Sequence, residues 1–279
     1  MFLIADSGAT KTDWALVSNR QLLARYQTQG LSPVHQSTDS LADILQKELF
    51  PQLSETECSG ISHIYFYGAG CRGLAQQQMK TMLQNCFPVA QIEVESDLLG
   101  AARAVCGHEK GLVCILGTGS NSCLYDGETI VENIPPLGYI LGDEGSGAVL
   151  GRMLLNRLFK DPTLSDLKEK FLSSYGLTYE DVIEHVYRRP LANRFLASLI
   201  PFIKENLSCK SLLELTTINF RNFLRNNILK YNTEVKSVYA VGGMTEAFHE
   251  QLSLACKEEG LQLKKTLKNP IEGLIVYHE

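Results

Sequence analysis

The sequence predicts an α/β protein with two lobes, the second of them rich in helices. Apolar runs and helical spacings up to residue 105 follow the order βββαβαβα. From residue 111 onwards a second group of three short strands begins, so the opening pattern recurs and indicates an internal duplication. With 279 residues, the chain is long enough for two lobes that each have a core.

The first lobe is expected to cover residues 1–108. Apolar runs on either side of the tight segment 7–9 predict that the lobe opens with a three-stranded antiparallel meander. The expected strands are 2–5, 14–17, 22–27, 61–67 and 91–95, and the expected helices are 41–50, 74–86 and 98–105.

The second lobe is expected to cover residues 109–279 and to contain a helical insertion. Because no low-complexity linker separates the lobes, we expect a tight hinge near 106–111, with the last helix packing back on the first lobe. The expected strands are 112–116, 122–125, 129–132, 237–241 and 261–264, and the expected helices are 148–159, 164–173, 179–186, 192–205, 212–231 and 246–258, before a last segment at 271–277.

Composition narrows the class of partner. A net charge of -5 and a pI near 5.8 disfavour nucleic acid and anionic membranes, since both need clustered Lys and Arg, and favour a small molecule. The apolar stretches are far shorter than the roughly 20 residues that cross a bilayer. The first acidic residue, Asp6, comes before a signal-peptide core could form. The eight cysteines form no C-x-x-C pair, so we expect a cytoplasmic protein with buried thiols.

Three turns that contain glycine follow apolar strands. They are the segments 6–13, 116–121 and 241–244, with Gly8, Gly117, Gly119, Gly242 and Gly243. Glycine allows the backbone to approach a polyphosphate, and exposed N–H groups and hydroxyls donate hydrogen bonds to its oxygens. A single turn of this kind is more typical of a plain hairpin, so the prediction of a phosphate site depends on the three turns together.

This set of turns resembles the phosphate-1, phosphate-2 and adenosine motifs of the superfamily of sugar kinases, heat-shock chaperones and actin. The closer resemblance is to the N-acetylglucosamine kinase branch of the BadF/BadG/BcrA/BcrD ATPase family. Three further segments carry it: 96–101 (Ser-Asp-Leu-Leu-Gly-Ala), 117–121 (Gly-Thr-Gly-Ser-Asn) and 138–147, with Asp-Glu-Gly-Ser inside a glycine-rich run. The resemblance implies an actin-like ATPase fold, in which a ribonuclease H-like motif is duplicated, and kinase activity toward a small amino sugar.

The resemblance also assigns roles to two carboxylates. Asp97 is the expected catalytic base that accepts the proton of the sugar hydroxyl, and Asp6 is expected to hold Mg²⁺, through water. Each has an ordinary structural alternative: Asp97 is a good residue for a helix N-cap, and Asp6 could form an Asx turn.

The remaining expected site residues divide between nucleotide and sugar. ATP phosphates would be bound by Gly8, Thr10, Lys11, Gly117, Thr118 and Gly119, and the adenine would approach Gly242 and Gly243. The sugar side would be lined by Asn121, Gly138 and Asp143, together with Asp97. Lys11 could instead be a solvated charge at a strand end. Glu144 could have a structural role alone, as a cap of the helix that follows it.

The sequence departs from the family in one loop. Segment 29–35 has the position of the family's sugar loop but lacks the asparagine that relatives acting on N-acetylglucosamine commonly have there. His35 is the candidate replacement, although an isolated histidine is more often a surface residue. The missing asparagine leaves the identity of the sugar open. The resemblance as a whole implies an acceptor of the N-acetylglucosamine or N-acetylmuramic acid type, phosphorylated at the 6-hydroxyl, and the family suggests a homodimer.

Three alternatives compete with the kinase. The run Gly68-Ala69-Gly70-Cys71-Arg72-Gly73 satisfies the dinucleotide-binding pattern, with Glu95 ending the next strand, and would indicate a nicotinamide enzyme. An ATP-driven activator of acyl-CoA dehydratases would need cysteines for an iron–sulfur cluster, for which Cys114 and Cys123 are the nearest candidates. A sugar-sensing regulator would carry a DNA-binding motif before the first strand, which begins at residue 2.

Overall fold

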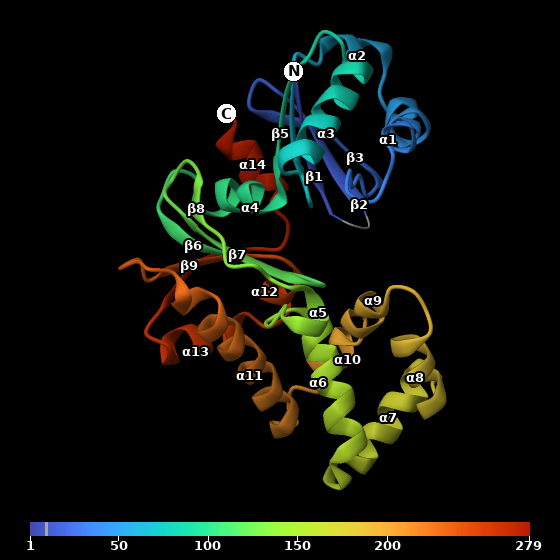
Figure 1. The fold of residues 1–279 in the computed structure, drawn as a ribbon, viewed down its shortest axis with the longest axis vertical. Helices are drawn as coiled ribbons and strands as arrows, with labels where there is room; N and C mark the ends of the chain where they lie inside the picture. The colour runs from blue at the N-terminus through green and yellow to red at the C-terminus, as the bar shows by residue number, and fades with distance from the viewer. Residues whose placement is uncertain (9–10) are drawn as a thin grey trace. The chain divides into compact units, whose positions relative to one another are not determined.

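The structure is a computed structural model that describes residues 1–8 and 11–279, and the chain divides into two units (Figure 1). Unit 1 consists of Met1–Glu109, Gly127–Thr129 and Asn269–Glu279. Unit 2 consists of Lys110–Asp126 and Ile130–Lys268. The chain thus crosses between the units several times, and its last eleven residues belong with its first hundred.

Unit 1 contains a five-stranded sheet in the order β3-β2-β1-β4-β5. The strands β1 to β3 form an antiparallel meander, whereas β4 and β5 run parallel to β1. The carboxyl ends of β1, β4 and β5 therefore meet at one edge, where Ser7 is paired with Gly68 and Gly68 with Ser96. The strands are β1 (Phe2–Ser7), β2 (Lys11–Ser18), β3 (Gln21–Gln29), β4 (His63–Gly68) and β5 (Gln91–Ser96).

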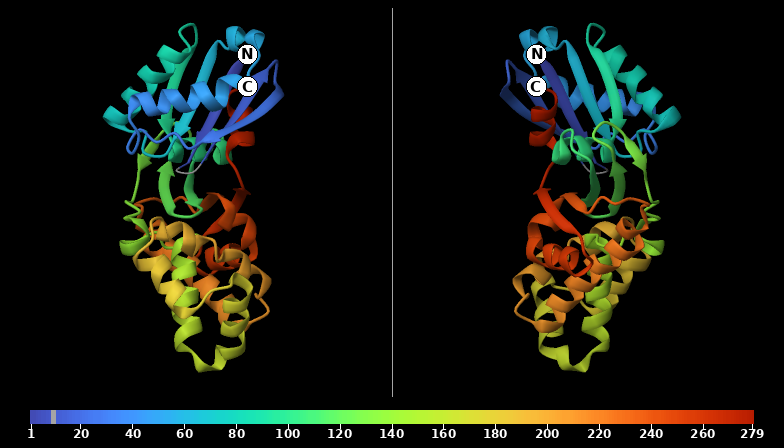
Figure 2. Two further views of the ribbon diagram at one scale, coloured as in Figure 1. Left: turned by 90° about the vertical axis from the view of Figure 1, so that its right-hand side faces the viewer. Right: turned by 90° about the vertical axis from the view of Figure 1, so that its left-hand side faces the viewer.

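Helices cover both faces of this sheet. On one face, α1 and α3 enclose a core that includes Trp14, Phe66 and Met79. On the other face lie α4 and α14, and Figure 2 shows α14, in red, beside the strands of unit 1. A Cβ on Gly273 of α14 would stand 2.2 Å from the Ala104 carbonyl oxygen of α4, so glycine allows this close approach. The helices are α1 (Thr38–Ile44), η1 (Leu45–Leu49), η2 (Phe50–Gln52), α2 (Glu55–Gly60), α3 (Gly73–Cys86), α4 (Asp97–Cys106) and α14 (Ile271–Tyr277).

Unit 2 repeats the sheet of unit 1. Its strand order is β10-β9-β6-β7-β8, with β6 to β8 antiparallel and β9 and β10 parallel to β6, so β6 corresponds to β1. The predicted duplication is thus present as the same topology built twice. The strands are β6 (Gly111–Leu116), β7 (Ser120–Tyr125), β8 (Ile130–Glu132), β9 (Ser237–Val241) and β10 (Gln262–Leu267).

The helices of unit 2 form one large core against the sheet. Phe220 and Phe223 of α11 and Leu150 of α6 are fully buried in it together with Leu116 of β6. The helices are α5 (Gly138–Leu141), α6 (Gly147–Lys160), η3 (Pro162–Leu164), α7 (Ser165–Tyr175), α8 (Tyr179–Tyr187), α9 (Ala192–Ala197), α10 (Ile200–Glu205), α11 (Lys210–Asn226), η4 (Ile228–Lys230), α12 (Gly243–Ala247) and α13 (His249–Glu258). Within the described parts of the chain, no helix combines the length and apolar character that a bilayer crossing requires.

Two predicted helices of unit 2 are each divided in the structure. The segment 192–205 forms α9 and α10, because Pro201 in the first turn of α10 has no N–H to donate to the preceding turn. The segment 246–258 belongs to α12 and α13, which are separated at Phe248, where a φ of -136° and a ψ of 41° are not helical. The prediction of a single helix was wrong in both places.

Candidate functional site

Two carboxylates lie at the carboxyl edge of the sheet in unit 1. Asp6 lies one row before the end of β1, opposite Asp13 of β2, and Asp97 directly follows the last residue of β5. Strand β4 lies between them in the sheet. Their charges interact, since Asp97 raises the pKa of Asp6. The carboxyl edge of parallel strands is where α/β proteins bind ligands, and both residues lie there.

Asp97 is not the N-cap of helix α4. That role belongs to Ser96, whose Oγ accepts a hydrogen bond from the Leu99 N–H at 3.2 Å. Asp97 is the first helical residue, and its Oδ1 accepts the Leu98 N–H at 2.9 Å. The capping alternative for Asp97 was therefore wrong, and the helix start has a cap without it.

Burial controls the ionisation of both carboxylates. It raises the pKa of Asp97, while the amide of Leu98 and the charge of Arg72 oppose the rise. The pKa of Asp6 rises to about 7, through burial first and then through repulsion from Asp97 and Asp13, against which Lys11 acts. A raised pKa means that the ionised carboxylate is destabilised by its surroundings, and a bound cation would offset this free-energy cost.

The residues around Asp6 fit a magnesium ion that is bound largely by water and phosphate. Among the residues that the structure describes, no three His, Cys, Asp or Glu side chains converge on a metal position. One carboxylate with water and phosphate oxygens is a usual magnesium environment. Lys11, the predicted phosphate contact, forms an ion pair with Asp13 at 2.7 Å and remains half exposed.

The first glycine turn is supported by a buried hydroxyl network. The Gly8 N–H donates to the Lys11 carbonyl at 3.0 Å, which joins the two ends of the turn. The hydroxyls of Ser7 and Thr12 lie 2.7 Å apart, and the Ser7 hydroxyl also bonds to the backbone of Leu31. The sequence analysis missed Ser7 and Thr12, although a serine and a threonine on the facing ends of two apolar strands were the available signal. The predicted contact Thr10 lies outside the described residues.

The loop in the position of the family's sugar loop is closed by its own hydrogen bonds. The carbonyl of Ser32 accepts the N–H groups of His35 and Gln36, and the Gln36 side chain accepts the Ser32 N–H at 2.7 Å. His35 is exposed. Val34 lies against the glycine run that follows β4, because a Cβ on Gly70 would stand 2.6 Å from a Val34 methyl carbon.

The glycine run 68–73 therefore serves this loop. In a dinucleotide fold the second glycine leaves room for the pyrophosphate, whereas here the space over Gly70 is filled by Val34. The antiparallel meander at the start of the sheet also differs from a dinucleotide fold. The nicotinamide alternative, which depended on Gly68, Gly70 and Gly73, is not supported.

The second and third glycine turns lie together in unit 2. Gly117 donates its N–H to the Gly119 carbonyl at 2.9 Å, and the first amides of α6 donate to the carbonyls of Gly117 and Thr118. Gly242 has a φ of 127°, and a Cβ there would stand 2.2 Å from the Leu116 carbonyl oxygen. Only glycine permits this approach. Gly243, the first residue of α12, has open space in front of its Cα.

Asp143 joins the second glycine turn from the segment before α6. Its carboxylate accepts the Ser120 N–H and lies against Gly119, where a Cβ would stand 2.9 Å from Oδ2. Burial raises the pKa of this carboxyl, and Glu144 adds to the rise. Asp143 has a φ of 52°, a left-handed conformation that is strained for residues other than glycine.

The strained segment is held by a residue that the sequence analysis missed. Asn219 of α11 is fully buried, accepts the Gly145 N–H at 3.0 Å and donates to the Ser146 carbonyl at 3.2 Å. A buried asparagine in an otherwise apolar helical stripe was the only signal for it. Glu144 does not cap α6, because Ser146 does so and Glu144 accepts a hydrogen bond from Asn226.

The other two predicted sugar residues have different surroundings. Asn121 accepts hydrogen bonds from the Ser122 N–H and from the Asn133 side chain at 2.9 and 3.0 Å, so part of its amide is used within unit 2. Gly138 is exposed and begins the short helix α5 with a φ of 74°. Unit 1 thus gathers Asp6, Gly8, Lys11 and Asp97, and unit 2 gathers Gly117 to Gly119, Asp143, Gly242 and Gly243.

Comparisons with known proteins bear on the family and the fold. No family model matches the sequence, and no curated protein matches it. A solved structure of a proposed N-acetylglucosamine kinase from Porphyromonas gingivalis is 45% identical, covers 100% of this chain and 98% of its own, and has a TM-score of 0.96. A second proposed N-acetylglucosamine kinase, from Chromobacterium violaceum, is 18% identical over 100% and 99% of the two chains, with a TM-score of 0.72.

A more distant match has the same fold. The ROK family glucokinase from Streptomyces griseus, solved with glucose and AMPPNP, is 13% identical over 99% of this chain and 97% of its own, with a TM-score of 0.56. At such identities the second and third matches show the fold alone. The three matches together confirm the predicted class of a duplicated, actin-like ATPase fold.

Proposed function

The chain belongs to the N-acetylglucosamine kinase-like family of the actin-like ATPases, and on this premise we propose that it transfers the γ-phosphoryl group of ATP to a small amino sugar. The observation that carries the proposal is that Asp97 lies at the carboxyl edge of the sheet and is not the N-cap of α4, since Ser96 has that role. A partly buried carboxylate in this place is suited to accept a proton.

The reaction requires one proton acceptor and fixed positions for two substrates. Asp97 takes the proton of the acceptor hydroxyl as its oxygen forms a bond to the γ-phosphorus. The bond from that phosphorus to the β–γ bridging oxygen breaks, and ADP leaves with the electron pair. Magnesium bound with ATP would offset the phosphate charge. Asp6, with its raised pKa of about 7, would hold the ion through water.

Backbone groups would bind the nucleotide. Gly8 and Lys11 in unit 1 and Gly117 to Gly119 in unit 2 offer short turns to phosphate, and the open space before Gly243 suits an adenine. The position of Thr10 in the same motif supports a hydroxyl contact to phosphate. Asp143, with Asn121 and Gly138, would bind hydroxyl and acyl groups of the sugar, because a buried carboxylate rejects a ligand that leaves it unpaired.

The identity of the acceptor is the finer part of the proposal. An N-acetylated amino sugar phosphorylated at its 6-hydroxyl is supported by the motif resemblance and by the proposed activity of the Porphyromonas gingivalis relative. The alternative of an acyl-CoA dehydratase activator has less support, because Cys114 and Cys123 are fully buried within β6 and β7 and do not reach a surface where a shared cluster could be bound.

An ADP-release assay tests the proposal. Purified protein with ATP and Mg²⁺ is offered a panel of N-acetylated amino sugars, free amino sugars and neutral hexoses, and ³¹P-coupled NMR of the product identifies the phosphorylated hydroxyl. We expect the highest kcat/KM with an N-acetylated amino sugar. If the protein transferred phosphate to none of these acceptors, the proposal would be overturned.

The role of Asp97 is tested with a matched pair of variants. Asp97→Asn should retain ATP binding and lose roughly 10²–10⁴-fold in kcat, the usual contribution of a positioned base. Asp39→Asn is the control, because Asp39 is also an acidic residue in the first turn of a serine-capped helix of unit 1. It should retain wild-type activity. An Asp97→Asn enzyme within a few fold of wild type would remove the residue from this role.

A further inference from the structure

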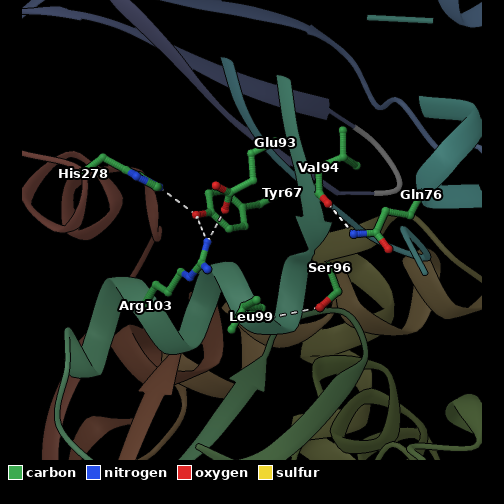
Figure 3. A network of polar contacts seen from close by, with 8 residues as sticks. All are labelled: Tyr67, Gln76, Glu93, Val94, Ser96, Leu99, Arg103 and His278. Carbon is green, nitrogen blue, oxygen red and sulfur yellow. Dashed lines mark hydrogen bonds and ion pairs between the residues drawn. The ribbon is translucent and has the colours of Figure 1, made fainter. Parts of the chain in front are cut away.

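A partly buried polar cluster lies between α4 and the face of the unit 1 sheet that this helix covers (Figure 3). Its centre is Tyr67 of β4, which is only 1% exposed. The Tyr67 hydroxyl lies 2.7 Å from Nε2 of His278 and accepts a hydrogen bond from Arg103 at 2.8 Å. Arg103 also forms an ion pair with Glu93 of β5. Residues from β4, α4 and the segment after α14 thus meet at one hydroxyl, and β5 joins them through Arg103.

The direction of each hydrogen bond follows from the charges. Burial raises the pKa of Tyr67, so its hydroxyl keeps its proton. Burial lowers the pKa of His278 to about 4, so the imidazole is neutral near pH 7 and Nε2 can accept. Arg103 can only donate. With the imidazole proton on Nδ1, the chain of donors runs from Arg103 to the Tyr67 oxygen, and from the Tyr67 O–H to Nε2 of His278.

Tyr67 also contacts the start of the helix that carries Asp97. A Cβ on Gly100 would stand 2.7 to 2.8 Å from three atoms of Tyr67, so the first turn of α4 rests directly on this side chain. Arg103 is one turn further along α4 and bonds to the hydroxyl. The ring and the hydroxyl of one tyrosine thus contact two successive turns of the helix that begins at Asp97.

The same tyrosine is linked to the strand of Asp6. In the parallel pairing of β1 with β4, Tyr67 is the register partner of Asp6, and in the next pair it is the partner of Glu95. Tyr67 therefore lies in the row between the two strands whose ends carry the site. A shift of its side chain would change the height of α4 above the sheet.

The cluster has features that favour an orienting role over simple stability. Among the described residues, Arg103 Nε is the one buried side-chain nitrogen or oxygen without a hydrogen-bond partner. Leaving a buried donor unpaired costs free energy, about 1–3 kcal/mol in typical cases. The His278 ring stacks on Tyr65 with centroids 3.6 Å apart, which fixes the acceptor for the Tyr67 hydroxyl. Arg103 is thus held in one orientation at a cost.

We propose that Tyr67 is a positioning residue for phosphoryl transfer, which holds the start of α4, and with it Asp97, at the height the reaction needs, with Arg103 and His278 orienting its hydroxyl. The proposal rests on the proposed kinase function. It gives the C-terminal segment a part in catalysis although that segment lies outside the glycine turns and carboxylates of the site.

The test compares two tyrosine-to-phenylalanine variants of the full-length protein. Tyr67→Phe keeps the ring against Gly100 and removes only the hydroxyl. Tyr26→Phe is the control, since Tyr26 is in the same unit and its hydroxyl also makes a side-chain hydrogen bond, to Glu57. We expect Tyr67→Phe to lower kcat about tenfold with an unchanged KM for ATP, because a misplaced base slows transfer without weakening nucleotide binding. Tyr26→Phe should change neither constant.

A second pair tests the C-terminal acceptor. His278→Gln offers an amide oxygen to the Tyr67 hydroxyl, whereas His278→Leu offers none. We expect kcat of the Gln variant to stay within about twofold of wild type and that of the Leu variant to fall as in Tyr67→Phe. Wild-type kcat in Tyr67→Phe, or equal losses in the Gln and Leu variants, would overturn the positioning role.

Hydrogen–deuterium exchange separates this inference from the proposed function. The amides of residues 97–100 should exchange faster in Tyr67→Phe than in wild type. Their exchange rates in Tyr26→Phe should equal those of wild type. If the wild-type protein transferred phosphate to no acceptor, the kinase proposal would fail, and the exchange rates would still decide whether Tyr67 holds the helix start. Equal exchange in the two phenylalanine variants would overturn that role.

Discussion

Gly119 and Asp143 lie so close together that a methyl group on Gly119 would stand 2.9 Å from Oδ2 of the Asp143 carboxylate. The carboxylate is held there because it accepts the Ser120 N–H, and the Asp143 N–H is bonded to the Pro136 carbonyl at 2.9 Å. The glycine at position 119 therefore sets how near the second glycine turn and the proposed sugar carboxylate can be.

The first prediction concerns this contact. Gly119→Ala should displace Asp143 and lower kcat/KM for the sugar about tenfold or more, since small displacements of binding groups slow transfer strongly. Gly119 is also a proposed phosphate contact, so the KM for ATP of the same variant is the internal control and should change less than kcat/KM for the sugar. The ADP-release assay at varied sugar and varied ATP concentration measures both. Equal changes in the two constants would show that the contact with Asp143 is not what matters.

The second prediction concerns the cost of ionising Asp6. In the folded protein its pKa is about 7, above the ordinary value of 3.8, so folding is favoured below that ordinary value and loses stability as the pH rises toward 7. Asp6→Asn should remove this loss and stabilise the protein at pH 8, without nucleotide or magnesium, by on the order of 1–3 kcal/mol. Thermal unfolding from pH 5 to pH 8 measures the difference.

The control for that prediction is internal to the pH series. The advantage of Asp6→Asn should shrink as the pH falls, because the wild-type carboxyl then gains its proton. His278, whose pKa is lowered to about 4, has the opposite dependence, but it is present in both proteins and cancels in their difference. A stability difference that stays constant from pH 5 to pH 8 would contradict the raised pKa of Asp6.

The third prediction concerns the asparagine that holds the strained segment. Asn219→Ala leaves the buried Gly145 amide without its acceptor and should lower the free energy of unfolding by about 2–3 kcal/mol, with a loss of activity through Asp143. Asn226→Ala is the control on the same helix, because Asn226 is exposed and its side chain donates a hydrogen bond to Glu144 at 2.8 Å. Its effect should stay within about 0.5 kcal/mol in urea unfolding.

The fourth prediction concerns the contact between α14 and α4. Gly273→Ala places a methyl group 2.2 Å from the Ala104 carbonyl oxygen, a backbone atom that cannot rotate away. We expect a loss of about 1–3 kcal/mol in stability, typical of overpacking, and faster exchange of the amides of α14. Glu272→Ala is the neighbouring control, since it removes only the exposed ion pair with Arg25 at 2.9 Å. Matching losses in the two variants would exclude the steric cause.

Periodicity predicted most of the architecture because the relevant information is local. The strands that open each unit are apolar runs of a few residues, and their ends fall within two or three residues of the predicted ones. Asp6, the glycine turns and Asp97 could be found in the same way, because each lies at the end of a strand or directly after it. The division of helix 192–205 could also have been foreseen from Pro201, whose missing N–H is a property of one residue.

The supports of the site could not be found in this way, because they pair residues that are far apart in the chain. Asn219 bonds to Gly145 and Ser146 across more than 70 positions, and Tyr67 bonds to His278 across 211. Spacing along the sequence carries no information about such partners. The two roles considered for Asp97, catalytic base and N-cap, also stood open in the sequence, because aspartate suits both and only the geometry of the helix start shows that Ser96 is the cap.

Because Asn269–Glu279 belong to unit 1, that unit cannot be completed before these residues have been synthesised. Every residue of unit 2 precedes α14 in the chain, so a chain that stops before residue 269 can already contain the whole of unit 2. Until then, the sheet face that will receive α14 and the ring of Tyr65 lacks its last helix. A released chain truncated after Lys268 should accordingly show a protease-resistant unit 2 and a protease-sensitive unit 1.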